Sequence, residues 1–223
     1  MMPIRLPLFA NHRTKYLYGA GIVLLTYMFY NITNHLELFP AGDLPLTAFE
    51  KALPVLPWTI WPYLSSFFVM AYIIFDVRDL DNLHRLTYAF LTLQIVCNLI
   101  FIFFPVNVPR DLFPIPEHVG PLTSWMFDFT RSVDTLRNTI PSLHVANSFL
   151  ISLVYVKENR PKFVFAFAWV LLISFSTLGT KQHYLWDVIS GLALAAVLFY
   201  LAFNPRIVTL YDPKHPDRTS AQK

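Results

Sequence analysis

The chain has 223 residues, of which 55% are hydrophobic and only 14% are charged, well below the charged share of about 25% that is usual in soluble domains. With a mean hydropathy of +0.47, the composition excludes a soluble globular protein and predicts an integral membrane protein. The net charge of +3 comes from basic residues scattered through predicted loops, which argues against a nucleic-acid partner. The single cysteine, Cys97, lies in an apolar segment and offers no disulfide within one chain.

Six apolar segments are long enough to be membrane helices, and they predict an all-α, six-helix bundle that forms one domain over residues 1–223. Before the second segment, a proline-rich connection opposes a continuous helix. The polar tail from Asn204 onward contains prolines, and we expect it to be loosely ordered. The predicted spans are residues 16–33, 58–75, 84–104, 142–156, 163–178 and 183–203.

The longest connection, residues 105–140, contains a second kind of helical pattern. Its apolar residues recur at helical spacing, while Asp128, Arg131 and Asp134 are turned elsewhere. We expect an amphipathic helix between spans three and four that lies flat on the membrane and borders the functional site. Its apolar positions are Leu122, Trp125, Met126, Phe129, Val133 and Leu136.

Six spans place both termini on one side of the membrane. Of the 17 Lys and Arg residues, the opposite side carries only Lys51, Arg110, Arg131, Arg137 and Lys181. By the positive-inside rule the termini are therefore cytoplasmic. We expect a multi-pass protein of the bacterial inner membrane whose chemistry-bearing residues face the periplasm.

Two histidines lie where predicted spans begin on that opposite side. His183 and Asp187 are four residues apart, so on a helix they share one face, where a carboxylate can hold an imidazole in one tautomer. A purely structural ion pair is the alternative, because an unpaired carboxylate near the lipid is costly. His144 alone would more often be a packed histidine, but the His–Asp pair on the same side favours a catalytic role.

Several residues beside the histidines are suited to phosphate. Ser142 follows Pro141 at a predicted helix start, where free N–H groups and the helix dipole favour an anion; its hydroxyl either binds phosphate or only caps the helix. Arg110 and Lys181 offer positive charge, and arginine can bind phosphate through two parallel bonds, although either can be an ordinary interfacial cation. No carboxylate cluster has metal-ligand spacing, so we expect neither a metal nor another cofactor.

The segments Pro141-Ser142-Leu143-His144 and Thr180-Lys181-Gln182-His183-Tyr184-Leu185-Trp186-Asp187 resemble the second and third signature motifs of the type 2 phosphatidic acid phosphatase superfamily. Leu143 and the Thr-Lys-Gln-His-Tyr run resemble the branch that includes inositol phosphorylceramide synthases. The first motif, a lysine followed at a distance by Arg-Pro, is absent, and Pro109-Arg110 is its nearest counterpart. Ser176-Thr177 stands where the third motif often has Ser-Arg, which leaves phosphate binding to Lys181, Arg110 and Arg137.

The resemblance implies a membrane enzyme that acts on a lipid phosphate or diphosphate. By it, His183 is the nucleophile that forms a phosphohistidine, Asp187 orients His183, and His144 is first the general acid and then the general base. Ser142 and the helix amides stabilise the phosphoryl oxygens, with Arg110 and Lys181 supplying charge.

Several functions remain open at this point. A phosphatase would use water as the acceptor, whereas a transferase would move a phosphorylated head group such as inositol phosphate to another lipid. The branch resemblance favours the transferase, and the short chain with small loops favours the phosphatase, which we take as the main prediction. A transporter is disfavoured because the polar residues cluster at one membrane face and no paired broken helices appear. The three retained residues, His144, His183 and Asp187, argue against an inactive relative.

Overall fold

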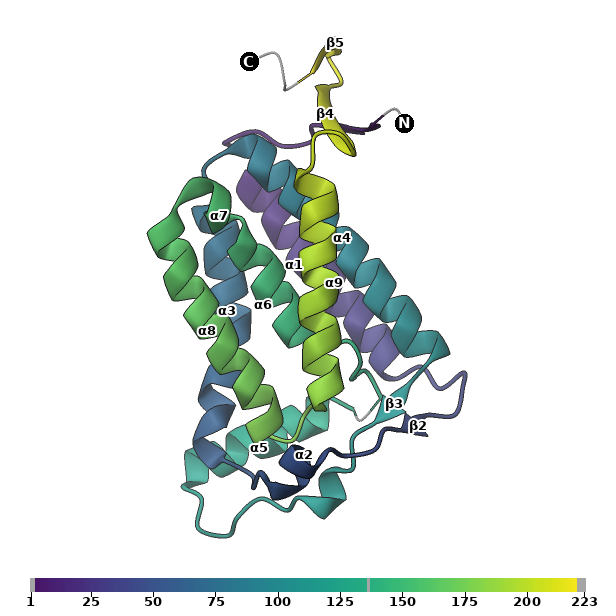
Figure 1. The fold of residues 1–223 in the computed structure, drawn as a ribbon, viewed down its shortest axis with the longest axis vertical. Coiled ribbons are helices and arrows are strands. Elements are labelled where there is room, and N and C mark those ends of the chain that lie inside the picture. Colours follow the sequence, from purple (N-terminus) through teal and green to yellow (C-terminus); the bar gives the residue numbers. More distant parts are fainter. Residues whose placement is uncertain (1–2, 136, 220–223) are drawn as a thin grey trace.

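The computed structural model describes residues 3–135 and 137–219, so Leu136 of the predicted amphipathic helix lies outside the described residues. Six helices run up and down in one bundle (Figure 1). Both termini lie at one end, which we call the terminal end; the opposite end, called the site end, carries α2 (Ala48–Ala52) and α5 (Pro121–Val133). The bundle helices are α1 (Lys15–Asn34), α3 (Ile60–Asp76), α4 (Leu80–Phe103), α6 (Leu143–Leu153), α8 (Arg160–Gly179) and α9 (Leu185–Phe203).

Among the described residues, four helical segments are long and apolar enough to cross a membrane, which supports the predicted integral membrane protein. They are Pro57–Asp76, where the short helix η1 (Pro57–Thr59) leads into α3, together with α4, α8 and α9. The other two expected spans also form helices. However, α1 carries tyrosine and asparagine side chains along its length, and α6 has 11 residues, about 17 Å at 1.5 Å per residue, before α7 (Tyr155–Glu158) continues toward the terminal end.

Helix α6 lies at the centre of the bundle and packs against α3, α4, α8 and α9. Its small residues Ala146, Ser148 and Ser152 are fully buried, and small side chains allow neighbouring helices to approach closely. At the site end, a Cβ atom added to Gly191 of α9 would lie 2.9 Å from the Ser142 carbonyl oxygen. Glycine at this position therefore lets the start of α6 approach the second turn of α9 closely.

Helix α2 holds the start of α9 from outside the bundle. Thr47 and Glu50 form a capping box at the start of α2. The buried Glu50 also accepts a hydrogen bond from the Leu185 N–H at 2.7 Å, which satisfies one of the free amides at the beginning of α9. The sequence gives no sign of this contact, because it joins residues 135 positions apart.

Two small sheets depart from the expected all-α fold. In the first sheet, β1 (Ile4–Pro7) is parallel to β4 (Val208–Asp212), and β4 is antiparallel to β5 (His215–Thr219). In the second sheet, β2 (Gly42–Asp43) is parallel to β3 (Val106–Asn107). The segment after Asn204 is thus ordered into strands, unlike the loosely ordered tail that we expected. The reason is the alternation of buried Val208 and Leu210, aided by the Arg85 guanidinium, which donates to the Ala202 and Val208 carbonyls.

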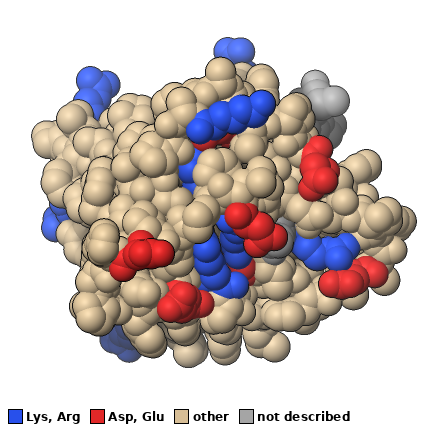
Figure 2. Space-filling view, turned by 90° about the horizontal axis from the view of Figure 1, so that it is seen from below, with Lys and Arg blue, Asp and Glu red and all other residues tan. Residues whose placement is uncertain are grey.

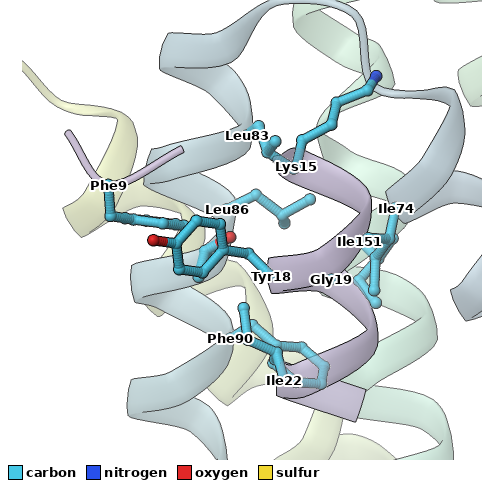
Figure 3. A pocket seen from close by; sticks show the side chains of 11 residues that line it. Phe9, Lys15, Tyr18, Gly19, Ile22, Ile74, Leu83, Leu86, Phe90 and Ile151 are labelled. Atoms are coloured by element: carbon cyan, nitrogen blue, oxygen red, sulfur yellow. The ribbon is translucent and has the colours of Figure 1, made fainter. Parts of the chain in front are cut away.

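The N-terminal segment is anchored across the terminal end by aromatic packing. The Phe9 ring meets the rings of His84, Tyr18 and Tyr88 edge-on, with centroids 4.5, 5.3 and 5.7 Å away. A cavity of about 20 Å³ remains between this segment, α1 and α4 (Figure 3). Hydrogen bonds from the Ala10 N–H to His84 Nε2 at 3.0 Å and from the Tyr88 hydroxyl to the Pro7 carbonyl at 2.7 Å also hold this segment against α4.

Candidate active site

His183 lies in the short turn between α8 and α9. This turn folds back onto the end of α8, because the amides of Gln182 and His183 donate to the Thr177 carbonyl at 3.1 and 3.3 Å. Lys181 adopts a φ of 58°, a left-handed conformation that is uncommon outside glycine. The tight turn places the His183 imidazole inside the protein rather than at its surface.

The imidazole of His183 is held in a single tautomer. Its Nδ1 lies 3.1 Å from the Thr139 carbonyl oxygen and 3.1 Å from Oδ2 of Asp187. Both partners accept hydrogen bonds only, so the proton must sit on Nδ1. Nε2 is buried and has no hydrogen-bond partner within the described residues, which leaves its lone pair available to attack an electrophile.

Asp187 is fully buried in the first turn of α9. Besides contacting His183, its Oδ2 accepts the Tyr184 N–H at 2.9 Å, while Oδ1 has no partner in the described chain. The i,i+4 contact with His183 is the one that the sequence spacing predicted. The position of the carboxylate thus depends on the helix start as well as on the histidine.

Ser142 occupies the N-cap position of α6, but its side chain makes no capping hydrogen bond. Its N–H donates instead to the Asp187 carbonyl at 3.0 Å, and its hydroxyl is buried without a partner among the described residues. A serine that served only as a cap would accept an N–H from the first turn. The hydroxyl therefore remains free for a ligand at the start of α6.

His144, in the first turn of α6, faces both α3 and His183. Its Nε2 lies 2.7 Å from the Tyr63 hydroxyl and its Nδ1 lies 3.2 Å from the Ser66 hydroxyl. The rings of His144 and His183 meet edge-on, with centroids 5.8 Å apart. The structure thus brings together the two histidines that the sequence placed in separate motifs.

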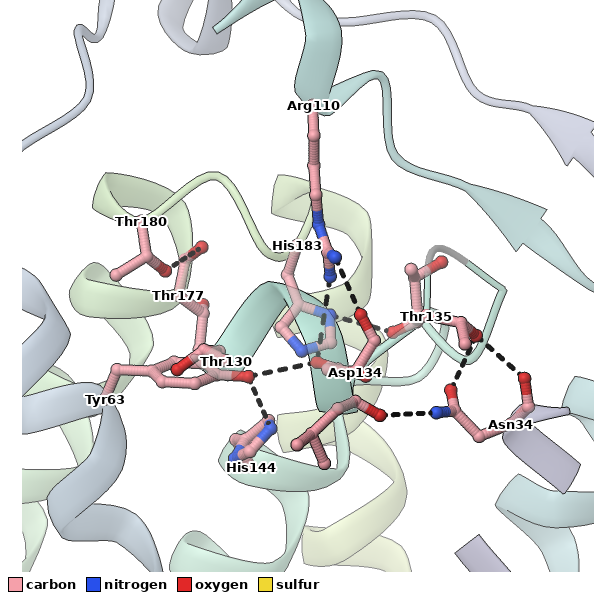
Figure 4. A network of polar contacts seen from close by, with 12 residues as sticks. Asn34, Tyr63, Arg110, Thr130, Asp134, Thr135, His144, Thr177, Thr180 and His183 are labelled. Carbon is pink, nitrogen blue, oxygen red and sulfur yellow. Dashed lines mark hydrogen bonds and ion pairs between the residues drawn. The ribbon is translucent and has the colours of Figure 1, made fainter. Parts of the chain in front are cut away.

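Asp134, which follows α5, contacts Arg110 directly and is linked to His144 through the Tyr63 hydroxyl (Figure 4). Arg110 donates to the Asp134 backbone carbonyl at 2.7 Å and lies 3.8 Å from its carboxylate. The same carboxylate accepts the Tyr63 hydroxyl at 3.2 Å and forms a short contact with the Tyr30 hydroxyl. We had expected Asp134 to point elsewhere on an amphipathic helix. No local sequence signal marks Tyr63, Tyr30 or Asp134 as neighbours, because they come from three separate elements.

Two predicted phosphate ligands make their contacts elsewhere at the site end. The Lys181 ammonium donates to the Glu50 backbone carbonyl at 2.7 Å and lies 4.1 Å above the Phe113 ring. Burial lowers its pKa, partly offset by the charge of Glu50. Arg137 pairs with Glu37 at 3.2 Å. Seen from this end, Lys and Arg atoms gather near the centre of the surface with acidic atoms around them (Figure 2).

Several buried polar atoms of the site have no partner within residues 3–135 and 137–219. A group of this kind is costly in a native protein and calls for a bound ligand or water. The donors are Ser142 Oγ, Gln182 Nε2, and Nε and Nη2 of Arg110, and they suit an anion with several acceptor oxygens. The acceptors are His183 Nε2, Asp187 Oδ1 and Gln182 Oε1. In the described part of the chain, no group of three or more His, Cys, Asp or Glu residues could hold a metal ion.

Comparison with known proteins identifies the family. The model of the PAP2 superfamily, the type 2 phosphatidic acid phosphatases, matches residues 58–201. This stretch includes α3, α6, most of α9 and the residues of the site described above apart from Tyr30, Glu37 and Glu50. The chain is also 28% identical over 176 residues to an uncharacterized protein of Methanocaldococcus jannaschii, covering 76% of this chain and 71% of the relative. Because the family model spans more than half of the chain and includes both histidines and Asp187, the chain belongs to the PAP2 superfamily of membrane phosphatases and related phosphotransferases.

Proposed function

We propose that this protein is an integral membrane phosphatase for a lipid phosphate or diphosphate and that it works through a phosphohistidine. Family membership supports the phosphatase-type chemistry on a lipid phosphate. The observation that carries the proposal is the state of His183. Its Nδ1 proton is fixed by two acceptors, and its Nε2 has no hydrogen-bond partner among the described residues, as is also true of the Ser142 hydroxyl and of Arg110 Nε.

In the first half-reaction, Nε2 of His183 attacks phosphorus, and the bond from phosphorus to the lipid oxygen breaks. His144 gives a proton to the departing alkoxide, exchanging one of its present contacts for that oxygen. Asp187 stabilises the positive charge that the His183 ring acquires. In the second half, His144 takes a proton from water, the water oxygen attacks phosphorus, and the P–N bond breaks to release inorganic phosphate.

The phosphoryl oxygens need donors throughout this sequence. We assign the main contacts to Ser142, the free amides at the start of α6, and Arg110, whose Nε and Nη2 make no hydrogen bond within the described residues. Lys181 and Arg137 contribute positive charge from a greater distance, because their side chains already bind Glu50, Phe113 and Glu37. The third motif often carries an arginine that this chain lacks, and the Arg110 guanidinium thus supplies most of the positive charge in its place.

We further propose that all six bundle helices cross the membrane, with the termini cytoplasmic and the site facing the other side. The basic residues concentrated toward the terminal end support this orientation. Helix α5 then lies in the outer interface. Its Leu122, Trp125 and Phe129 side chains are exposed, and the last two stack with ring centroids 5.6 Å apart, which suits an apolar face resting on lipid.

A transferase is the second candidate, supported by Leu143 and by the Thr180–Tyr184 run, which resemble the inositol phosphorylceramide synthase branch. It shares the first half-reaction and differs only in the acceptor, an alcohol in place of water. Free phosphate distinguishes hydrolysis from transfer, which would produce a new phosphodiester.

The test uses purified protein in detergent with phosphatidic acid, an isoprenyl diphosphate, or phosphatidylinositol plus ceramide. We expect phosphate release, an acid-labile phosphoenzyme from a substrate labelled in its phosphate, and loss of both in His183→Ala. His118→Ala, an exposed histidine in the site-end loop, is the matched control and should stay active. Turnover by His183→Ala at the wild-type rate would refute the assignment.

A further inference from the structure

A cavity of about 240 Å³ lies beside His144 of α6 and is bounded by α1, α3, α4 and α5. We call it the slot. Its walls are largely apolar, with Phe67 and Met70 from α3 and Phe90 from α4. His144 lines it and His183 does not. Because His144 is the proposed acid for the leaving oxygen, the slot is in the position that a leaving group would occupy.

The slot opens sideways toward the lipid. Tyr27 of α1, Phe67 of α3 and Phe129 of α5 line it and are also 58%, 52% and 48% exposed on the outside of the bundle. Toward the terminal end the opening closes, because Gly19 of α1 packs against Ile74 of α3, where an added Cβ would lie 3.3 Å away. A hydrocarbon chain can therefore enter between α1 and α3 without crossing the polar face of the protein.

Two amides line the slot one turn deeper than His144. Asn147 shares a face of α6 with His144, and its Oδ1 accepts from Gln94 Nε2 of α4 at 2.7 Å. We call Gln94 and Asn147 the amide pair. Gln94 Oε1 is buried without a partner in the described residues. Among those same residues the Asn147 amide nitrogen makes no hydrogen bond, so one acceptor and one donor remain. If the oxygen and nitrogen positions of both side-chain amides were exchanged, one donor and one acceptor would still remain free.

We propose that the slot holds the chain of the leaving lipid and that the amide pair binds a hydroxyl or amide group carried about one helical turn, roughly 5 Å, from the reacting oxygen. This proposal rests on the proposed function. A hydroxyl or a secondary amide offers both a donor and an acceptor, which matches the pair, whereas a plain alkyl chain would leave Gln94 Oε1 unsatisfied at a cost.

The first test compares two substrates of equal chain length: an alkyl phosphate with no other polar group, and a phosphate of an N-acyl amino alcohol that carries a hydroxyl and an amide beside the phosphate. In Gln94→Leu and Asn147→Leu we expect kcat/KM to fall about tenfold for the second substrate, as expected for lost hydrogen bonds in a buried site, and to change less than about twofold for the first. Equal losses on both substrates, or none on either, would overturn the role of the amide pair.

The second test reads binding without turnover, so it separates this proposal from the proposed function. An alkyl phosphate with a photoreactive diazirine on its chain is cross-linked, and the modified residues are identified by mass spectrometry. We expect adducts on the slot residues Phe67, Met70 and Phe90, and their loss in Ala71→Trp, which fills the slot. Phe68→Trp, on the lipid-facing side of α3 and 77% exposed, should keep them.

Adducts confined to the outer surface would overturn the slot even if the protein hydrolyses lipid phosphates. Conversely, slot adducts in a protein that hydrolyses no phosphate would refute the proposed function and keep the binding site. If a leucine variant fails to purify, the Ala71→Trp and Phe68→Trp pair still decides whether the slot is occupied.

Discussion

Replacing Asp187 by asparagine separates the charge of this residue from its control of the tautomer. In the wild type, Oδ2 accepts both the Tyr184 N–H and the His183 Nδ1–H. An asparagine must place its oxygen at the same position, because an NH₂ group there would face the Tyr184 N–H. The Thr139 carbonyl independently requires a proton on Nδ1. Asp187→Asn should therefore keep the wild-type tautomer and lose only the negative charge.

The expected loss follows from the strength of one hydrogen bond. A bond to a charged group contributes about 1.5–3 kcal/mol and a neutral one about 0.5–1.5 kcal/mol, so the developing imidazolium loses about 1.5 kcal/mol of stabilisation, or roughly tenfold in rate. If the tautomer changed instead, the loss would approach the roughly 10⁴-fold that this exchange causes in the serine-protease triad. The two mechanisms thus differ about a thousandfold in their expected outcome.

The assay is single-turnover formation of the phosphoenzyme, with kcat and KM measured in parallel. We expect kcat to fall about tenfold and KM to change little, since other groups bind the phosphate. Asp187→Ala is the comparison, because it also leaves the Tyr184 N–H buried and unpaired, at a cost of about 1–3 kcal/mol in unfolding free energy. A loss near 10⁴ in Asp187→Asn would show that Thr139 and Tyr184 do not hold the tautomer, and an unchanged kcat would show that the charge is dispensable.

Further predictions concern helix contact, His144, metal and topology. Gly191→Ala places a Cβ atom 2.9 Å from the Ser142 carbonyl oxygen. We expect it to lower the unfolding free energy by about 1–3 kcal/mol and to lower kcat as well. A variant with full activity would contradict the role of this contact. Tyr63→Phe removes the hydroxyl that holds the general acid and should reduce kcat several-fold in a steady-state assay, as expected for one net hydrogen bond of about 1 kcal/mol. EDTA should leave phosphate release unchanged, and restoration by Mg²⁺ after a loss would mean that a metal takes part. With the native cysteine replaced, cysteines at the exposed positions Glu117 and Lys157 should label from opposite sides of the membrane, and labelling from one side would refute six spans.

The sequence predicts those parts of the molecule that depend on neighbouring residues. Apolar segments of the right length gave the helices, and the four-residue spacing placed His183 against Asp187. The motifs also indicated that His144 and His183 belong to one site. The first two signals lie within a single helix or turn, where periodicity determines which residues share a face, whereas the link between the two histidines came from the resemblance of their motifs to one family.

The contacts that the sequence does not reveal are those between distant segments. Glu50 reads as an ordinary acid of a short helix, yet it receives the first amide of α9. Tyr63 reads as one aromatic in an apolar span, yet it bridges Asp134 and His144. Lys181 reads as a phosphate ligand, yet its ammonium turns toward the Glu50 carbonyl. Such partners are determined by how the helices pack together, and no periodic pattern in the sequence indicates which distant residues will meet.

The parallel pairing of β1 with β4 constrains the order in which the protein can be completed during synthesis. Ile4 aligns with Val208, so β1 emerges from the ribosome long before its partner strand is synthesised. Until then, the backbone N–H and C=O groups of β1 must form hydrogen bonds with water or with lipid headgroups. Only after α9 is inserted can Arg85 reach the Val208 carbonyl and the sheet close. Closure over so long a loop is slow compared with local helix formation. The sheet is therefore a late event in biogenesis, and a nascent chain arrested before Val208 should display β1 to chaperones or proteases while the helices of the bundle are already in the membrane.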